Sequence, residues 1–102
     1  MVFGKFSIDR IDRKVHLPDV SAPRLTSTEF DLLWALASRA GEVVSREDLT
    51  RLLRRIEFGG LDRSIDCYIS KLRRKLSDDA LEPTRIKTIR SKGYQFNKHG
   101  WE

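Results

Sequence analysis

The stretch that decides the fold runs from Asp62 to Leu76 and reads DRSIDCYISKLRRKL. Its large aliphatic residues recur at helical spacing, at Ile65, Ile69, Leu72 and Leu76. This spacing predicts an amphipathic helix over about residues 62–76, with Asp62 as the N-cap and one apolar face in the core. The opposite face carries cations and small polar groups and no carboxylate: Arg63, Ser64, Cys67, Ser70, Lys71 and Arg74. The two shoulders of the helix carry Arg73 and Lys75.

A helix with an apolar anchor and a cationic outer face is suited to the major groove of B-DNA. The groove admits an α-helix, cations reach its phosphates, and small side chains permit close approach to the bases. The run Arg73-Arg74-Lys75 also has a simpler explanation, because cations at a solvated helix end suit the helix dipole. The helix taken alone leaves both interpretations open.

A basic hairpin follows this helix. Side chains from Ile86 to Arg90 alternate between apolar and polar, Ser91-Lys92-Gly93 is turn sequence, and Tyr94 to Phe96 predicts the return strand. The tip of the hairpin then carries Arg90 and Lys92, and an arginine at that place can reach a DNA minor groove. The same two cations would also discourage edge-to-edge pairing of strands.

Two further helices precede residues 62–76. Thr26 and Glu29 have the spacing of a capping box, which predicts a helix from Thr26 to about Gly41. Ser45 and Asp48 mark the start of a second helix, whose apolar stripe is Leu49, Leu52, Leu53 and Ile56. This second helix, a turn and the helix at 62–76 make a helix-turn-helix.

The first 24 residues read as short strands. Phe6 and Ile8 alternate with polar neighbours, and so do Val15 and Leu17, which predicts a small antiparallel sheet over about residues 2–24. Helices must cover one face of so small a sheet. A length of 102 residues argues for one domain, residues 1–102. The predicted fold class is therefore α+β, a winged helix-turn-helix.

Basic charge is concentrated in the C-terminal half of the chain. The formal net charge is +5. Residues 26–50 hold five acids and two bases, whereas residues 85–99 hold five bases and no acid. This distribution favours a binding face for a polyanion over a uniform solubilising shell.

Other classes of function are less well supported by the sequence. Catalysis, a metal site and a cofactor are not expected, because His16 and His99 are far apart, Cys67 is the sole cysteine, and no glycine-rich phosphate motif is present. An RNA-binding module would need aromatic side chains arranged as a stacking platform, which the sequence does not indicate. A winged helix used only for protein contacts stays open, and it predicts no salt-dependent binding to DNA.

Four stretches resemble the C-terminal effector domain of OmpR/PhoB response regulators, in order and at the right spacing: residues 25–33, 44–49, 62–76 and 86–96. The resemblance covers nearly the whole chain. It implies a winged helix with an N-terminal four-stranded sheet, three helices and a C-terminal hairpin wing. It also implies a parent protein with a receiver domain, acting in a two-component phosphorelay that controls transcription.

The resemblance implies roles for individual residues. Those facing the DNA major groove would be Ser64, Cys67, Tyr68, Ser70, Lys71 and Arg74. Contacts with the DNA backbone would come from Ser45, Arg46, Arg63, Arg73 and Lys92. Arg90, in a wing of about residues 86–97, would reach the minor groove. Two positions depart from the family pattern: Ser91-Lys92 stands where a glycine is common, and Cys67 where a small aliphatic residue is common.

The partners implied are double-stranded DNA with direct-repeat half-sites, a second copy of the domain bound head to tail, and a sensor kinase acting on the receiver domain. The loop of residues 54–61 would contact RNA polymerase, although it is short and lacks a tryptophan. Since no signal-peptide pattern and no long apolar run is present, we expect a cytoplasmic bacterial protein that joins the nucleoid when bound, with no membrane partner.

Overall fold

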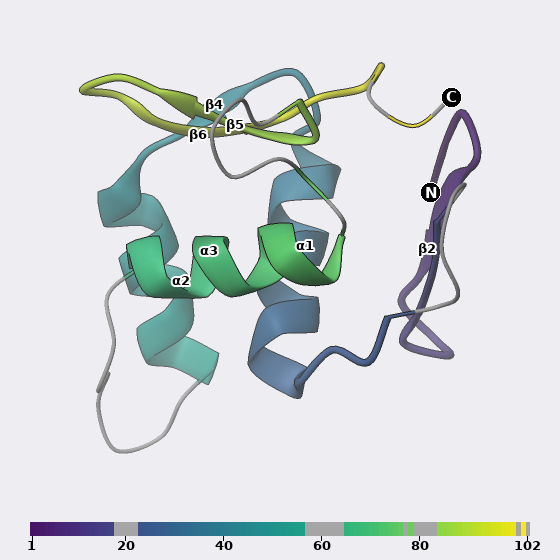
Figure 1. Cartoon of the computed structure of the whole chain (residues 1–102). Helices are drawn as coiled ribbons and strands as arrows, with labels where there is room; N and C mark the ends of the chain where they lie inside the picture. Colours follow the sequence, from purple (N-terminus) through teal and green to yellow (C-terminus); the bar gives the residue numbers. More distant parts are fainter. Residues whose placement is uncertain (18–22, 57–64, 77, 79–83, 100, 102) are drawn as a thin grey trace.

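The computed structural model describes residues 1–17, 23–56, 65–76, 78, 84–99 and 101. Their order is β1 (Val2–Phe3), β2 (Phe6–Asp9), β3 (Lys14–His16), α1 (Ser27–Ser38), β4 (Val43–Val44), α2 (Arg46–Ile56), α3 (Ile65–Lys75), β5 (Ile86–Ile89) and β6 (Gly93–Phe96). In Figure 1, α3 crosses in front of α1 and α2, the β5–β6 hairpin lies above it, and β1–β3 stand at the other side of α1. The predicted α+β class, with three helices and a C-terminal hairpin, is confirmed.

The N-terminal sheet is antiparallel, with the strand order β1-β2-β3. Ile8 pairs with Val15 across β2 and β3, and both side chains are buried together with Phe6. The family resemblance implies four strands here, whereas the described residues form three; residues 18–22 lie outside them. The short strand that follows α1 joins the second sheet, where Val44 pairs with Tyr94.

Helix α1 is the central element of the core. The predicted capping box is present: the hydroxyl of Thr26 accepts the Glu29 N–H at 3.2 Å, and Glu29 Oε1 accepts the Thr26 N–H at 2.8 Å. These bonds satisfy two backbone donors that a helix start leaves free. The helix is then covered on several sides, because its three central leucines are fully buried: Leu32, Leu33 and Leu36.

Helices α2 and α3 pack their apolar stripes against α1. The hydroxyl of Ser45 accepts the Asp48 N–H at 3.1 Å, so the predicted start of α2 is confirmed. The stripe of α3 is buried as predicted, at Ile65, Ile69, Leu72 and Leu76. Helix α3 runs from Ile65 to Lys75, and the predicted N-cap, Asp62, lies outside the described residues.

The C-terminal hairpin completes a three-stranded sheet in the order β4-β6-β5. Its turn, residues 90–92, holds Ser91 in a left-handed conformation with φ of 63°, which places the chain reversal just before β6. Gly93 has φ of 146°, and a Cβ there would stand 2.1 Å from the carbonyl oxygen of Val44. Only glycine allows β4 and the hairpin to approach this closely.

A C-terminal tryptophan joins the two sheets. Trp101 is fully buried, with its ring 4.4 Å from that of Phe6 and 5.2 Å from that of Phe96. Its indole N–H donates to the carbonyl oxygen of Asn97 at 2.7 Å, so the polar end of the ring is satisfied. In the described part of the chain, no helix is long and apolar enough to cross a membrane.

Candidate nucleic-acid interface

The outer face of α3 presents thiol, hydroxyl and cationic groups to solvent. Cys67, Ser70 and Arg74 are exposed, and Lys71 is half-buried. They surround one shallow hollow on the helix surface. Four of the residues expected at the major groove therefore lie together, while Ser64 and the neighbouring Arg63 lie outside the described residues.

The prediction that this face carries no carboxylate is wrong. Asp66 lines the same hollow, and its side chain is 58% exposed. It lies in the first turn of α3, where a negative charge suits the positive end of the helix dipole. Asp66 comes one residue after the buried Ile65, so its side chain leaves the helix between the apolar stripe and the outer face.

The prediction that Tyr68 faces outward is also wrong, because only 9% of the residue is exposed. Tyr68 comes three residues after Ile65 and four before Leu72, and helical neighbours at these spacings share a side. Burial of the large ring against the core outweighs the expected polar orientation.

Arg73 holds α3 to the hairpin. Its guanidinium donates to the carbonyl oxygen of Ile86 from Nε at 3.0 Å and from Nη2 at 2.7 Å, and Nη2 also donates to the hydroxyl of Thr88 at 2.7 Å. The charged group lies 5.6 Å from the centre of the Tyr94 ring. The residue is half-buried, and burial lowers its pKa. Arg73 thus bonds within the fold and fixes strand β5 beside α3, and its contact with the DNA backbone stays a prediction.

A second connection joins α3, the hairpin and the start of α2. Oδ1 of Asp66 accepts a hydrogen bond from Arg46 Nε at 2.9 Å and another from the hydroxyl of Tyr94. The bond from Tyr94, and after it the bond from Arg46, lowers the pKa of Asp66, so its carboxylate stays charged. Burial and the bond to Asp66 raise the pKa of Tyr94, and the bond to Asp66 raises that of Arg46.

Sequence reasoning missed Asp66 and Tyr94 as members of this cluster. Asp66 lies 20 positions after Arg46 and 28 positions before Tyr94, so no local spacing joins the three residues. The available signal was that Asp66 is the one acid between Ile65 and Lys75, in a segment that carries four cations.

The start of α2 is exposed beside α3. Arg46 opens the helix and is exposed, whereas Ser45 is half-buried and its hydroxyl caps the helix. Glu47 and Asp48 follow, and both carboxylates pair with Arg51 at 2.7 and 3.5 Å. Arg46 is therefore the cation at this helix start that lies nearest the outer face of α3.

The turn of the hairpin carries the two remaining expected contacts. Arg90 and Lys92 are both exposed and flank Ser91. Because Arg73 and Tyr94 tie the hairpin to α3, this turn has a set position relative to that helix (Figure 1). The structure holds the outer face of α3 and the basic hairpin turn together in one domain, as the sequence predicts.

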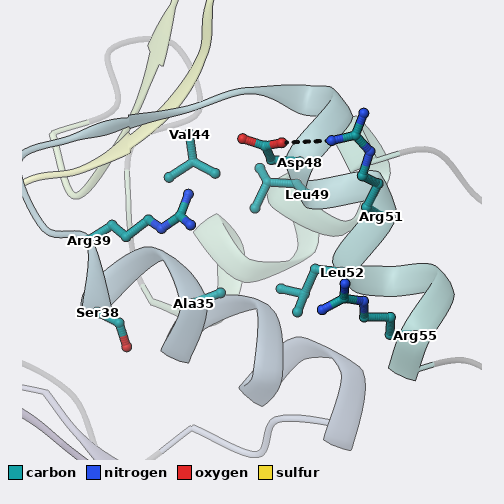
Figure 2. A pocket seen from close by; sticks show the side chains of 9 residues that line it. All are labelled: Ala35, Ser38, Arg39, Val44, Asp48, Leu49, Arg51, Leu52 and Arg55. Carbon is teal, nitrogen blue, oxygen red and sulfur yellow. Dashed lines mark hydrogen bonds and ion pairs between the residues drawn. The ribbon is translucent and has the colours of Figure 1, made fainter.

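A different hollow lies between α1 and α2. Figure 2 shows Arg39, Arg51 and Arg55 at its rim, with Leu49 and Leu52 between the helices. Arg51 is already paired with Asp48. No residue of α3, β5 or β6 is among those that line this hollow in the described chain, so it is separate from the candidate interface.

Comparison with known proteins identifies a family. Residues 21–96 match the family described as transcriptional regulatory protein, C terminal. The transcriptional regulatory protein RstA of Escherichia coli strain K12 is 49% identical over 100 residues, which is 98% of this chain and 41% of that protein. The chain therefore spans about two fifths of the length of this curated relative.

Solved structures agree with that result. The crystal structure of the Klebsiella pneumoniae RstA DNA-binding domain in complex with RstA box is 44% identical, with a TM-score of 0.83 over 97% of each chain. The solution structure of the C-terminal effector domain of BfmR from Acinetobacter baumannii is 50% identical, with a TM-score of 0.78 over 97% of this chain and 90% of that one. The chain thus belongs to the family of C-terminal domains of transcriptional regulatory proteins, as an effector domain of the OmpR/PhoB type.

Proposed function

We propose that this domain binds double-stranded DNA with sequence specificity, as the output domain of a two-component response regulator that controls transcription. The observation that carries the proposal is a group of polar and cationic side chains around one hollow, on a helix that is anchored in the core and tied to a basic hairpin. The group consists of the exposed Cys67, Ser70 and Arg74 and the half-buried Lys71. The similarity to a domain crystallised with its DNA box supports the same conclusion.

In this proposal α3 enters the major groove. Lys71 and Arg74 supply donors for acceptor groups on base edges, and a lysine or arginine bonded to guanine is the commonest specific contact. Either side chain can also donate to a phosphate, which positions the domain without reading the sequence. Ser70 is small and allows close approach, while Cys67 offers an apolar contact for a thymine methyl group. Ser64, outside the described residues, is proposed for the same face.

The flanking elements position the domain on the DNA backbone and in the adjacent groove. The start of α2 offers free backbone N–H groups and the cation of Arg46, which together suit a phosphate. Ser45 and Arg63 are proposed for the same backbone. At the hairpin turn, Lys92 would contact phosphate and Arg90 would enter the minor groove, whose negative potential attracts arginine.

The whole protein's partners are part of the proposal. By analogy with the family, two copies bind direct-repeat half-sites head to tail, and a sensor kinase acts on a receiver domain in a cytoplasmic bacterial protein. Residues 54–61 are proposed to contact RNA polymerase; residues 57–61 lie outside the described part of the chain. Nothing in the proposal calls for catalysis.

The test is selection of bound duplexes from a random pool, followed by sequencing and by titration of the enriched duplex at several salt concentrations. The proposal expects an enriched direct-repeat motif and an affinity that falls steeply with salt, because each neutralised phosphate releases counterions. Absence of binding at low salt would reject DNA as the partner and favour a protein-contact module. An unenriched pool that nevertheless binds would reject sequence specificity.

A further inference from the structure

Asp66 is an acid at a surface proposed to meet a polyanion. Its exposed carboxylate lies in one hollow with Lys71 and Arg74, the two cations proposed for the major groove. A negative charge at this place repels DNA phosphates, and such a charge weakens binding wherever the surrounding cations do not neutralise it. A surface that served only to bind DNA tightly would carry no carboxylate at this position.

The carboxylate also occupies the groups that a phosphate would use. Its Oδ1 accepts from the guanidinium of Arg46 at 2.9 Å and from the hydroxyl of Tyr94. A guanidinium N–H and a side-chain hydroxyl are both common donors to DNA phosphate oxygens. The Arg46 guanidinium is further confined because it lies 5.3 Å from the centre of the Tyr94 ring.

We propose that Asp66 acts as an intramolecular competitor for DNA phosphate, holding Arg46 in the free domain and so limiting binding to unrelated DNA. The inference rests on the proposed function and names a specificity-determining residue for it. On a preferred sequence α3 enters the major groove fully, so a DNA phosphate approaches Arg46 and displaces the carboxylate of Asp66. On unrelated DNA the helix does not seat, Arg46 stays with Asp66, and one cation is withheld from the backbone.

A purely structural role for Asp66 makes the opposite prediction. If the carboxylate served only to tie α2, α3 and β6 together, then its removal would loosen the interface and lower affinity for every duplex. As a competitor, its removal raises affinity for unrelated DNA. The direction of the change therefore separates the two roles.

The test compares wild type with Asp66→Asn, which keeps the shape and an acceptor oxygen but removes the charge. Affinity is measured for the selected duplex and for an unrelated duplex, across a range of salt concentrations. The matched control is Asp31→Asn, which makes the same charge change at another arginine pair, 3.1 Å from Arg13 and on the side of α1 that faces β3. Asp66→Ser provides a second neutral replacement if the asparagine variant proves unstable.

We expect Asp66→Asn to bind unrelated DNA about threefold or more tightly than wild type, with a salt slope steeper by about one unit. The affinity ratio between selected and unrelated DNA falls, while Asp31→Asn matches wild type in both. In an Arg46→Gln background the added Asp66→Asn leaves the salt slope unchanged, because no cation remains to be released.

Equal or weaker binding of unrelated DNA by both neutral variants overturns the inference while leaving DNA binding intact. An equal gain from Asp31→Asn also overturns it, since net charge would then explain the effect. If wild type binds no duplex at all, both the proposed function and this inference fail, and the wild-type titration alone reveals that outcome.

Discussion

Nζ of Lys75, in the last turn of α3, lies 2.5 Å from Oε1 of Glu29, in the first turn of α1. Glu29 is almost fully buried and also closes the capping box of α1 by accepting the Thr26 N–H. One carboxylate thus starts the central helix and holds the end of the proposed recognition helix against it. The orientation of α3 depends on this pair as well as on the aliphatic stripe.

Replacement of Glu29 by glutamine should lower the free energy of unfolding by about 1–3 kcal/mol, because hydrogen bonds to a buried charged group are lost or weakened. Urea unfolding at pH 7 measures this change. Asp31→Asn, on the same helix but with a more exposed pair, is the control and should cost less. An unchanged midpoint for Glu29→Gln would mean that the pair contributes nothing to stability.

The loss of unfolding free energy in Glu29→Gln should also depend on pH. Burial pushes the pKa of Glu29 upward, but the hydrogen bonds from Lys75 and Thr26 outweigh it, so the pKa lies below its ordinary value of 4.5. The charge of Glu29 therefore stabilises the fold fully above that ordinary value, and this contribution disappears as the pH falls through the lowered pKa. The difference between wild type and Glu29→Gln should shrink over that acid range.

Trp101→Ala should destabilise the domain by about 3–5 kcal/mol, since removal of a fully buried indole leaves a cavity between Phe6 and Phe96. Thermal and urea unfolding both report the change. Trp101→Phe keeps an aromatic ring but loses the bond to Asn97 and part of the buried indole volume, so its cost should be smaller than that of the alanine variant. Equal stability of the alanine variant and wild type would show that Trp101 does not contribute to the core in solution.

Lys71→Ala should weaken binding to the selected duplex by about 1–3 kcal/mol and reduce the preference for that sequence over others. The reason is its place on the outer face of α3, beside Cys67 and Arg74. Fluorescence anisotropy with both duplexes measures the two affinities. Lys14→Ala, an exposed lysine in β3, is the charge-matched control and should bind normally. An equal loss on every sequence would make Lys71 a phosphate contact instead.

Arg46→Ala should weaken binding to the selected duplex and make its salt slope shallower by about one unit, because the phosphate contact that Arg46 makes on that duplex is lost. Titration of one duplex over a series of salt concentrations gives the slope. A slope equal to that of wild type would remove Arg46 from the proposed backbone contacts. The variant should keep the wild-type fold, since its side chain is exposed.

Much of the fold could be predicted because its signals are local. The Thr26–Glu29 capping box, the aliphatic stripe from Ile65 to Leu76 and the turn before Gly93 each depend on residues a few positions apart. Such spacings determine helix starts, buried faces and hairpins before any tertiary contact forms.

Other features depend on packing between distant segments, which spacing does not encode. The pairing of Val44 with Tyr94, and the bonds from Arg46 and Tyr94 to Asp66, join residues from four elements, β4, α2, α3 and β6. Tyr68 was expected at the groove from its motif position, but its ring is large enough that burial decides its direction. The sequence predicts that the candidate site lies on α3 and the hairpin turn, and it predicts the cations there. It does not predict that the carboxylate of Asp66 lies among them.

An NMR titration of the labelled domain with the selected duplex, following each backbone amide, locates the DNA-binding surface. We expect the largest shift changes in α3, from Ile65 to Lys75, and at the hairpin turn of residues 90–92, with little change in β1–β3. Largest changes in β1–β3, or around the hollow between α1 and α2, would contradict the claim that α3 and the hairpin form the DNA-binding surface.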